Sequence, residues 1–73
     1  MLRVGPPRGY RSGRREEQAR LTRRRILDAA RAVFLDRGFA GATVRMIAAH
    51  AGVSVPAVEL LIGTKGRLLK AAI

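Results

Sequence analysis

Apart from a surplus of cations, few side chains in this sequence could act chemically. The only histidine is His50, and the only serines are Ser12, in a glycine-punctuated segment, and Ser54, which suits a helix cap. These residues make no convincing nucleophile–base pair, and five scattered acids are too few for paired-carboxylate catalysis. The chain has no cysteine, which excludes a disulfide or a cysteine-based zinc site. We therefore expect no enzyme, no metal site and no cofactor.

Positive charge is the most abundant chemical feature of the sequence. The 73 residues carry 15 lysines and arginines against 5 acids, a formal net charge of +10, and nine of the arginines lie in the first 25 residues. Such a surplus favours a polyanionic partner, and nucleic acid is the first candidate. No apolar run approaches the length that spans a bilayer, and the N-terminus lacks the apolar stretch of a secretory signal. We therefore expect a cytoplasmic protein that does not bind membranes.

The elements that must position these cations begin after a tail. Residues 1–15 contain glycines, Pro6-Pro7 and little apolar surface to offset the entropy of ordering, so we expect an arginine-rich disordered tail. Two roles stay open for it, a solubilising tail or an arm that contacts DNA. Residues 16–73 are expected to form one domain.

Apolar spacing and capping residues predict four helices in that domain. The first should bury Ile26, Ala30, Val33 and Phe34 and end at a left-handed Gly38, with Phe39 folded back on Phe34. The N-caps Thr43, Ser54 and Thr64 start the next three helices, and Gly52 and Gly63 separate them. Their inward faces should hold Val44, Ile47, Ala48 and Ala51, then Val58, Leu61 and Ile62, then Leu68, Leu69 and Ile73. This predicts a small all-α domain with a homeodomain-like three-helix core and the start of a fourth helix.

Residues 43–62 show the spacing of a helix-turn-helix. Ala48 is small where the two helices approach closest, Gly52 allows the turn, Val53 fills the gap and Val58 packs the second helix on the first. The second helix of this motif enters the major groove of DNA. An ordinary helical hairpin needs neither this spacing nor a net charge of +10.

Several segments, taken in order, resemble the DNA-binding domain of TetR-type transcriptional regulators. They are residues 22–34, 37–39, 43–48, 51–54, 64–65 and 68–69, so the resemblance covers about residues 20–73. It implies sequence-specific binding of double-stranded DNA and regulation of transcription, usually as a repressor. It also implies that the full-length form is a homodimer, with a small-molecule effector site in a domain outside this chain.

The resemblance also assigns roles by position. The start of the second helix of the motif, which we call the reading helix, supplies Ser54, Val55, Pro56, Ala57, Glu59 and Leu60. The resemblance assigns the phosphate contacts to Thr22, Arg23, Thr43, Val44, Arg45 and Lys65. The reading helix departs from the family pattern at Val55, Glu59 and Leu60. Its exposed face thus contains no Lys, Arg, Asn or Gln, the residues that make bidentate contacts with guanine and adenine. It offers methyl-bearing groups suited to thymine, and Glu59 either accepts from cytosine or stays solvated.

Two alternatives from other classes are open. The arginines of residues 8–25 would suit a basic amphipathic protein that binds RNA or anionic membranes without sequence choice. A helical module that binds only another protein is the other alternative. The fixed spacing of Ala48, Gly52 and Val58 favours the helix-turn-helix over the first alternative, and the clustering of arginines argues against the second.

Overall fold

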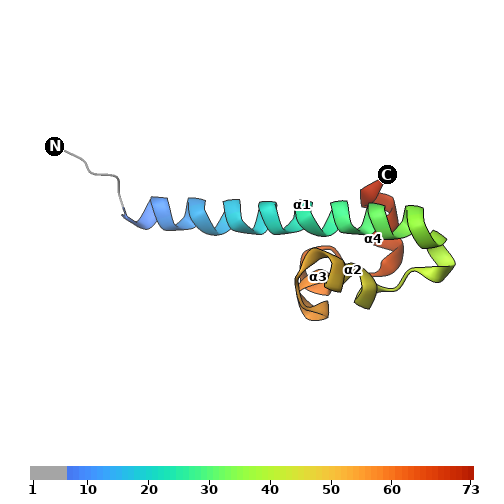
Figure 1. Cartoon of the computed structure of the whole chain (residues 1–73). Coiled ribbons are helices and arrows are strands. Elements are labelled where there is room, and N and C mark those ends of the chain that lie inside the picture. Colours follow the sequence, from blue (N-terminus) through green and yellow to red (C-terminus); the bar gives the residue numbers. More distant parts are fainter. Residues whose placement is uncertain (1–6) are drawn as a thin grey trace.

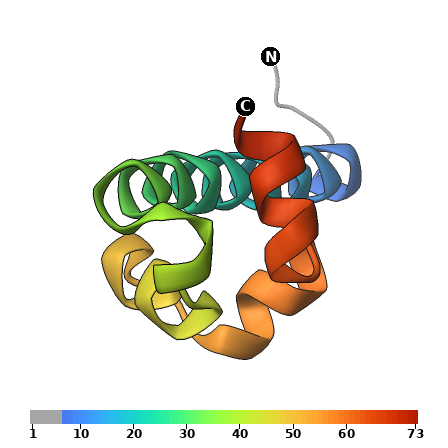
Figure 2. The same ribbon diagram turned by 90° about the vertical axis from the view of Figure 1, so that its right-hand side faces the viewer.

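The computed structural model describes the backbone of residues 7–73 and the side chains of residues 13–73. These residues form four α-helices, with no strand among them: α1 (Pro7–Gly41), α2 (Val44–Ala51), α3 (Val55–Leu61) and α4 (Lys65–Ala72). The predicted all-helical fold is confirmed. Helices α2 to α4 gather under the C-terminal half of α1 (Figure 1), and they form an arch that begins and ends on α1 (Figure 2).

Helix α1 begins much earlier than predicted. The sequence predicted a start at residue 16, whereas the backbone is helical from Pro7. Proline fits the first turn of a helix, and the arginine- and glutamate-rich residues that follow are good helix formers. Glu17 also pairs with Arg20 one turn later. Residues 7–15, expected to be disordered, are thus helical in the structure, and residues 1–6 of the predicted tail lie outside the described residues.

The predicted break at Gly38 is present, with a different backbone angle. Gly38 has φ 74° and ψ 170°, so its φ is positive as expected while its ψ is extended rather than left-handed helical. The chain therefore bends sharply within α1 before the last turn to Gly41. Phe39 folds back as predicted, and its ring stacks on Phe34 with the ring centroids 5.8 Å apart. Ala42, directly after this turn, is fully buried.

The three predicted N-caps are all confirmed. The hydroxyl oxygens of Thr43, Ser54 and Thr64 accept hydrogen bonds from the amides of Met46, Ala57 and Arg67, each three residues later. An N-cap of this kind satisfies one of the amides that a helix start leaves without an intrahelical partner. These caps fix where the three short helices begin, which matters because each spans only two turns or so.

The core is small and rich in alanine. It consists of Ile26, Ala29, Ala30 and Val33 from α1, then Ala42, then Ile47, Ala48 and Ala51 from α2, Val58 from α3 and Leu68 from α4. Small side chains let the three short helices approach α1 closely around the larger Ile26, Ile47 and Leu68. The prediction that Ile73 belongs to the apolar side of α4 is wrong. Ile73 follows the last helical residue, and 92% of it is exposed.

Candidate DNA interface

The turn between α2 and α3 has the geometry that the sequence predicted. Gly52 adopts the left-handed conformation, with φ 77° and ψ 30°. The amide of Val53 donates to the carbonyl of Ala48 at 3.0 Å, which closes the C-terminal end of α2. Ala48 and Val58 are buried and Val53 is half-buried. The two helices are bent by 98° relative to one another, within the range found for helix-turn-helix units.

The exposed face of α3 is a short stripe. Pro56, Glu59 and Leu60 lie at positions i, i+3 and i+4, and all three are exposed, Leu60 by 85%. Val55 and Ala57, also predicted to meet DNA, are half-buried because they lie nearer the body of the domain. The sixth predicted residue, Ser54, is exposed, and its hydroxyl is engaged as the cap of α3.

The start of α2 presents a second candidate contact. Thr43 and Arg45 are exposed, and Val44 is half-buried. The Thr43 hydroxyl accepts the amide of Met46 at 3.0 Å, while the first amides of any helix have no carbonyl of their own helix to bind. These donors, the positive end of the α2 dipole and the Arg45 guanidinium suit a phosphate group.

Lys65, predicted to contact phosphate, has partners within the protein. Its ammonium donates to the carbonyl oxygens of Phe39 at 2.8 Å and Ala42 at 2.9 Å. The same ammonium lies 4.3 Å from the centroid of the Phe39 ring, a cation–π distance. Lys65 thus ties the start of α4 to the connection that leads from α1 into α2. A lysine ammonium has three protons, so this tie leaves one for another acceptor.

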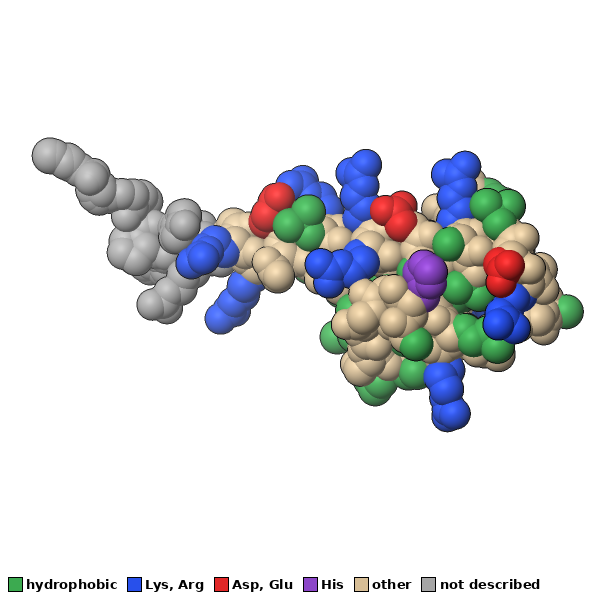
Figure 3. Space-filling view, viewed as in Figure 1, with side chains coloured by type: hydrophobic (Ala, Val, Ile, Leu, Met, Phe, Trp, Pro, Cys, Tyr) green, Lys and Arg blue, Asp and Glu red, His purple; other side chains and the backbone are tan. Residues whose placement is uncertain are grey.

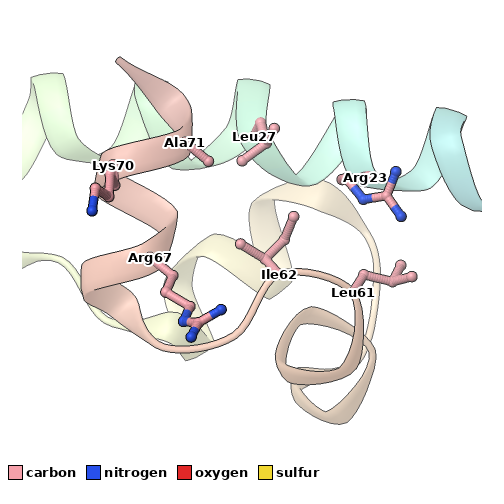
Figure 4. Close-up of a pocket in the computed structure, with 7 residues that line it drawn as sticks. All are labelled: Arg23, Leu27, Leu61, Ile62, Arg67, Lys70 and Ala71. Carbon is pink, nitrogen blue, oxygen red and sulfur yellow. The ribbon is translucent and has the colours of Figure 1, made fainter.

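Arg23 from α1 borders a groove with Arg67 and Lys70 from α4. The groove holds about 560 Å³, and its apolar floor consists of Leu27, Leu61, Ile62 and Ala71. Figure 4 shows Arg23 and Arg67 on either side of the end of α3. No acid lines this groove, so its three cations face one another across apolar surface. Thr22, the neighbour that the sequence analysis paired with Arg23, is half-buried on α1.

Arg67 is not among the phosphate contacts that the sequence predicted. It lies two positions after Lys65, and helix residues two apart point to nearly opposite sides. Lys65 therefore turns toward the end of α1 while Arg67 turns toward the end of α3. A side chain on Gly63 would meet the Arg67 stem, since a Cβ built there lies 2.7 Å from Arg67 Cδ. Gly63 also has φ 127°, which by itself explains a glycine there, so the sequence gives no separate signal for Arg67.

Cations dominate the surface outside the core. Side chains of Lys and Arg stand out along α1 on the face that Figure 3 shows, with few acids among them. Asp36 lies 3.8 Å from Arg37 and Glu17 pairs with Arg20, and each pair offsets a single cation of the fifteen in the sequence. The arrangement presents a positive surface with one short apolar stripe on α3.

Other classes of site find little support among residues 13–73. No group of three or more His, Cys, Asp or Glu side chains gathers there in a way that could hold a metal ion, and His50 is exposed at the end of α2. Of the described helices, none is by itself both long and apolar enough to cross a bilayer. Helices α2 and α3 reach that length and composition only when taken together across their bend.

The fold and the turn define a helix-turn-helix DNA-binding domain. Comparison with protein-family models matches residues 26–72 to the bacterial regulatory proteins of the tetR family. The chain belongs to this family, so it is a DNA-binding protein of transcription regulation, and the resemblance seen in the sequence is confirmed. No curated protein and no solved structure matches the chain in the corresponding comparisons.

Proposed function

We propose that this chain is the DNA-reading head of a transcriptional repressor that binds a specific double-stranded sequence. The observation that supports this most is the exposed α3, capped by Ser54 and set at 98° to α2 by the Gly52 turn. In this proposal α3 enters the major groove, and Ser54, Val55, Pro56, Ala57, Glu59 and Leu60 make up its contact segment. The half-buried Val55 and Ala57 contribute mainly by shaping the start of that segment.

The proposal gives the phosphate contacts to three elements around α3. Thr43, Val44 and Arg45 hold one phosphate at the start of α2. The donors there are exposed, and the helix dipole favours an anion. Thr22 and Arg23 act from α1, and Lys65 offers its remaining proton from the start of α4. Phosphate contacts of this kind fix the position of α3 and carry no sequence information themselves.

Arg67 joins these contacts in the proposal. It borders the same acid-free groove as Arg23, and the apolar floor between them suits the deoxyribose that links two phosphates. The guanidinium groups stand on either side of the end of α3 (Figure 4). A strand of the duplex that passes the end of α3 would therefore meet positive charge from both α1 and α4.

The full-length form is proposed to act as a homodimer in the cytoplasm. Two heads then engage half-sites about 34–36 Å apart, one helical turn of DNA. Its small-molecule effector site is proposed to lie in a domain outside this chain. No catalytic role is proposed, since binding of a regulatory sequence needs none.

The test is binding to duplex DNA of mixed sequence, measured by fluorescence anisotropy over a series of salt concentrations. The chain should bind in the range of about 10⁻⁴–10⁻⁶ M at physiological salt. Arg45→Gln should reduce the salt slope of log K by about one unit. Arg37→Gln is the matched control, because it removes the same charge from an exposed arginine beside Asp36 that is not among the proposed contacts. Equal effects of the two variants would contradict the proposed orientation.

Repression has its own test. A reporter gene placed behind the sequence that the full-length protein selects should fall in expression when that protein is present. The Gly52→Val variant should not repress it, because the turn that sets α3 is lost. Increased expression of the reporter would make the protein an activator and overturn this part of the proposal.

A further inference from the structure

The exposed stripe of α3 is apolar with a single charge. Leu60 is 85% exposed. Pro56 lies one turn before it on the same side, and Glu59 stands beside it. Among the described residues no hydrogen bond or ion pair is found for the Glu59 carboxylate. The stripe thus offers two hydrocarbon surfaces and one acceptor, with no side-chain donor.

Each base pair shows a different pattern in the major groove. Guanine shows two acceptors, adenine an acceptor and a donor, cytosine a donor, and thymine an acceptor beside its C5 methyl group. A hydrocarbon side chain gains nothing from an unpaired donor or acceptor, which loses its water on contact. The thymine methyl group is the largest apolar group on these edges, so it is the natural complement of Leu60 and Pro56.

The carboxylate of Glu59 favours a different pyrimidine. It can accept a hydrogen bond only from an amino group, which cytosine and adenine both present in the major groove. In adenine the amino group lies beside the N7 acceptor, whose lone pair repels a carboxylate. In cytosine its neighbour is a C–H group, which does not. Glu59 therefore fits cytosine better than adenine.

We infer that α3 reads pyrimidines, with Leu60 and Pro56 in contact with thymine methyl groups and Glu59 accepting from cytosine N4. This inference rests on the proposed function, since it requires α3 to lie in the major groove. The half-site should then carry adjacent thymine and cytosine on the strand that faces the stripe. Most of the binding energy would come from phosphates, and the choice of sequence from a few apolar contacts.

The experiment removes the methyl groups from the DNA. Duplexes that the chain selects from a random library are resynthesised with deoxyuridine in place of thymidine, one position at a time. This change deletes only the C5 methyl group and leaves the hydrogen-bonding pattern intact. At each contacted thymine the affinity should fall about fourfold, the factor that corresponds to roughly 0.8 kcal/mol for one buried methyl group.

Protein variants assign each methyl group to a side chain. Leu60→Ala should abolish the difference between thymine and uracil at one position, and Pro56→Ala at a neighbouring one. Because both residues are exposed, neither change should unfold the domain, which circular dichroism would verify. Leu35→Ala is the matched control, since Leu35 is 82% exposed on α1, and it should leave the uracil effect unchanged.

The possible outcomes separate the inference from the proposed function. If the chain binds no duplex at all, both fail. If it binds duplexes without selecting any sequence, or selects sequences whose affinity does not change with uracil, the inference fails while DNA binding stands. A uracil effect that persists in Leu60→Ala and in Pro56→Ala would assign the methyl contact to other residues and overturn the inference as well.

Discussion

The two halves of α1, divided at Ile26, run without a break as far as the bend at Gly38 and are stabilised by different interactions. From Ile26 onward its inner face is buried against α2 and α4, and the family match also begins at residue 26. Before that point the helix projects past the body (Figure 1), and the side chains from Gly13 to Arg25 are exposed or at most half-buried. The projecting half is therefore helical through local propensity and the Glu17–Arg20 pair, whereas the other half is helical because tertiary packing requires it.

The two halves of α1 therefore contribute different properties, stability from the packed half and positive charge from the projecting half. The packed half supplies the core, and the projecting half lies in the region where nine of the fifteen cations are found. A helix with few tertiary contacts opens readily, so the part of α1 that projects beyond the groove at Arg23 can open at little cost to the fold. The body cannot open in this way, because its small core depends on every contact. Changes in the two regions should therefore affect different properties.

The largest effect is expected from the core. Ile47→Ala should destabilise the domain by about 2–5 kcal/mol, because Ile47 is fully buried and the vacated space cannot be refilled by neighbouring alanines. Thermal unfolding followed by circular dichroism measures this loss. Leu21→Ala, in the projecting half where Leu21 is 52% exposed, should change stability by less than about 0.5 kcal/mol. Comparable losses in both variants would contradict the division of α1 into packed and projecting halves.

Replacement of glycine by alanine should have opposite effects on stability at two positions, Gly52 and Gly13. Gly52→Ala should cost about 1–2 kcal/mol, because an alanine at φ 77° is strained even though its Cβ meets no other atom within 4 Å. Gly13→Ala should instead strengthen the projecting helix by about 0.5–1 kcal/mol, because Gly13 lies inside a regular helix with open space around it. Unfolding of the body measures the first, and helix content at low temperature the second. A neutral Gly52→Ala would mean that the turn does not hold the left-handed conformation in solution.

Removal of residues 1–15 tests the role of the projecting half directly. The deletion takes away five arginines and none of the core residues among those that the structure describes, so affinity for duplex DNA should fall several-fold and the salt slope should flatten. The melting temperature of the body should stay the same. Full-strength binding by the shortened chain would leave the segment as a solubilising tail, the other role that the sequence left open.

The smallest effect is expected at the groove. Arg67→Gln should reduce the salt slope by about one unit and weaken binding alike for all sequences, and Arg67→Lys should restore most of the loss. Arg37→Gln again serves as the control. If Arg67→Gln changed the preferred sequence and left the slope unaltered, Arg67 would touch a base rather than a phosphate.

The sequence predicted most of the body because the relevant signals are local. A threonine or serine before a helix, and a glycine after it, act through hydrogen bonds within one turn, so Thr43, Ser54, Thr64 and Gly52 were located correctly. The start of α1 was missed since the glycines and prolines near it were weighed as helix breakers, whereas Pro7 begins the helix. Ile73 was misplaced because periodicity continued past the last residue that has a neighbour to pack on.

The partners of Lys65 could not be found in this way. Its acceptors on Phe39 and Ala42 are 26 and 23 residues away. Both are backbone carbonyls, which every residue has, so the residue types do not indicate which of them accepts. The Arg67 groove is likewise made by three helices at once. The predicted DNA-contacting residues of α2 and α3 remain predictions, and the structure adds which of them are exposed.

The tie made by Lys65 gives the chain two chemically different lysines. Lys70, the other lysine of the sequence, is exposed, and acylation of its amine would change little beyond the charge of the groove. The same acyl group on Lys65 would remove the cation that stacks on Phe39 and the donors that hold two carbonyls. The segment that precedes Thr43 would then lose its anchor to α4. Acylation would therefore change the structure at Lys65 and only the surface charge at Lys70.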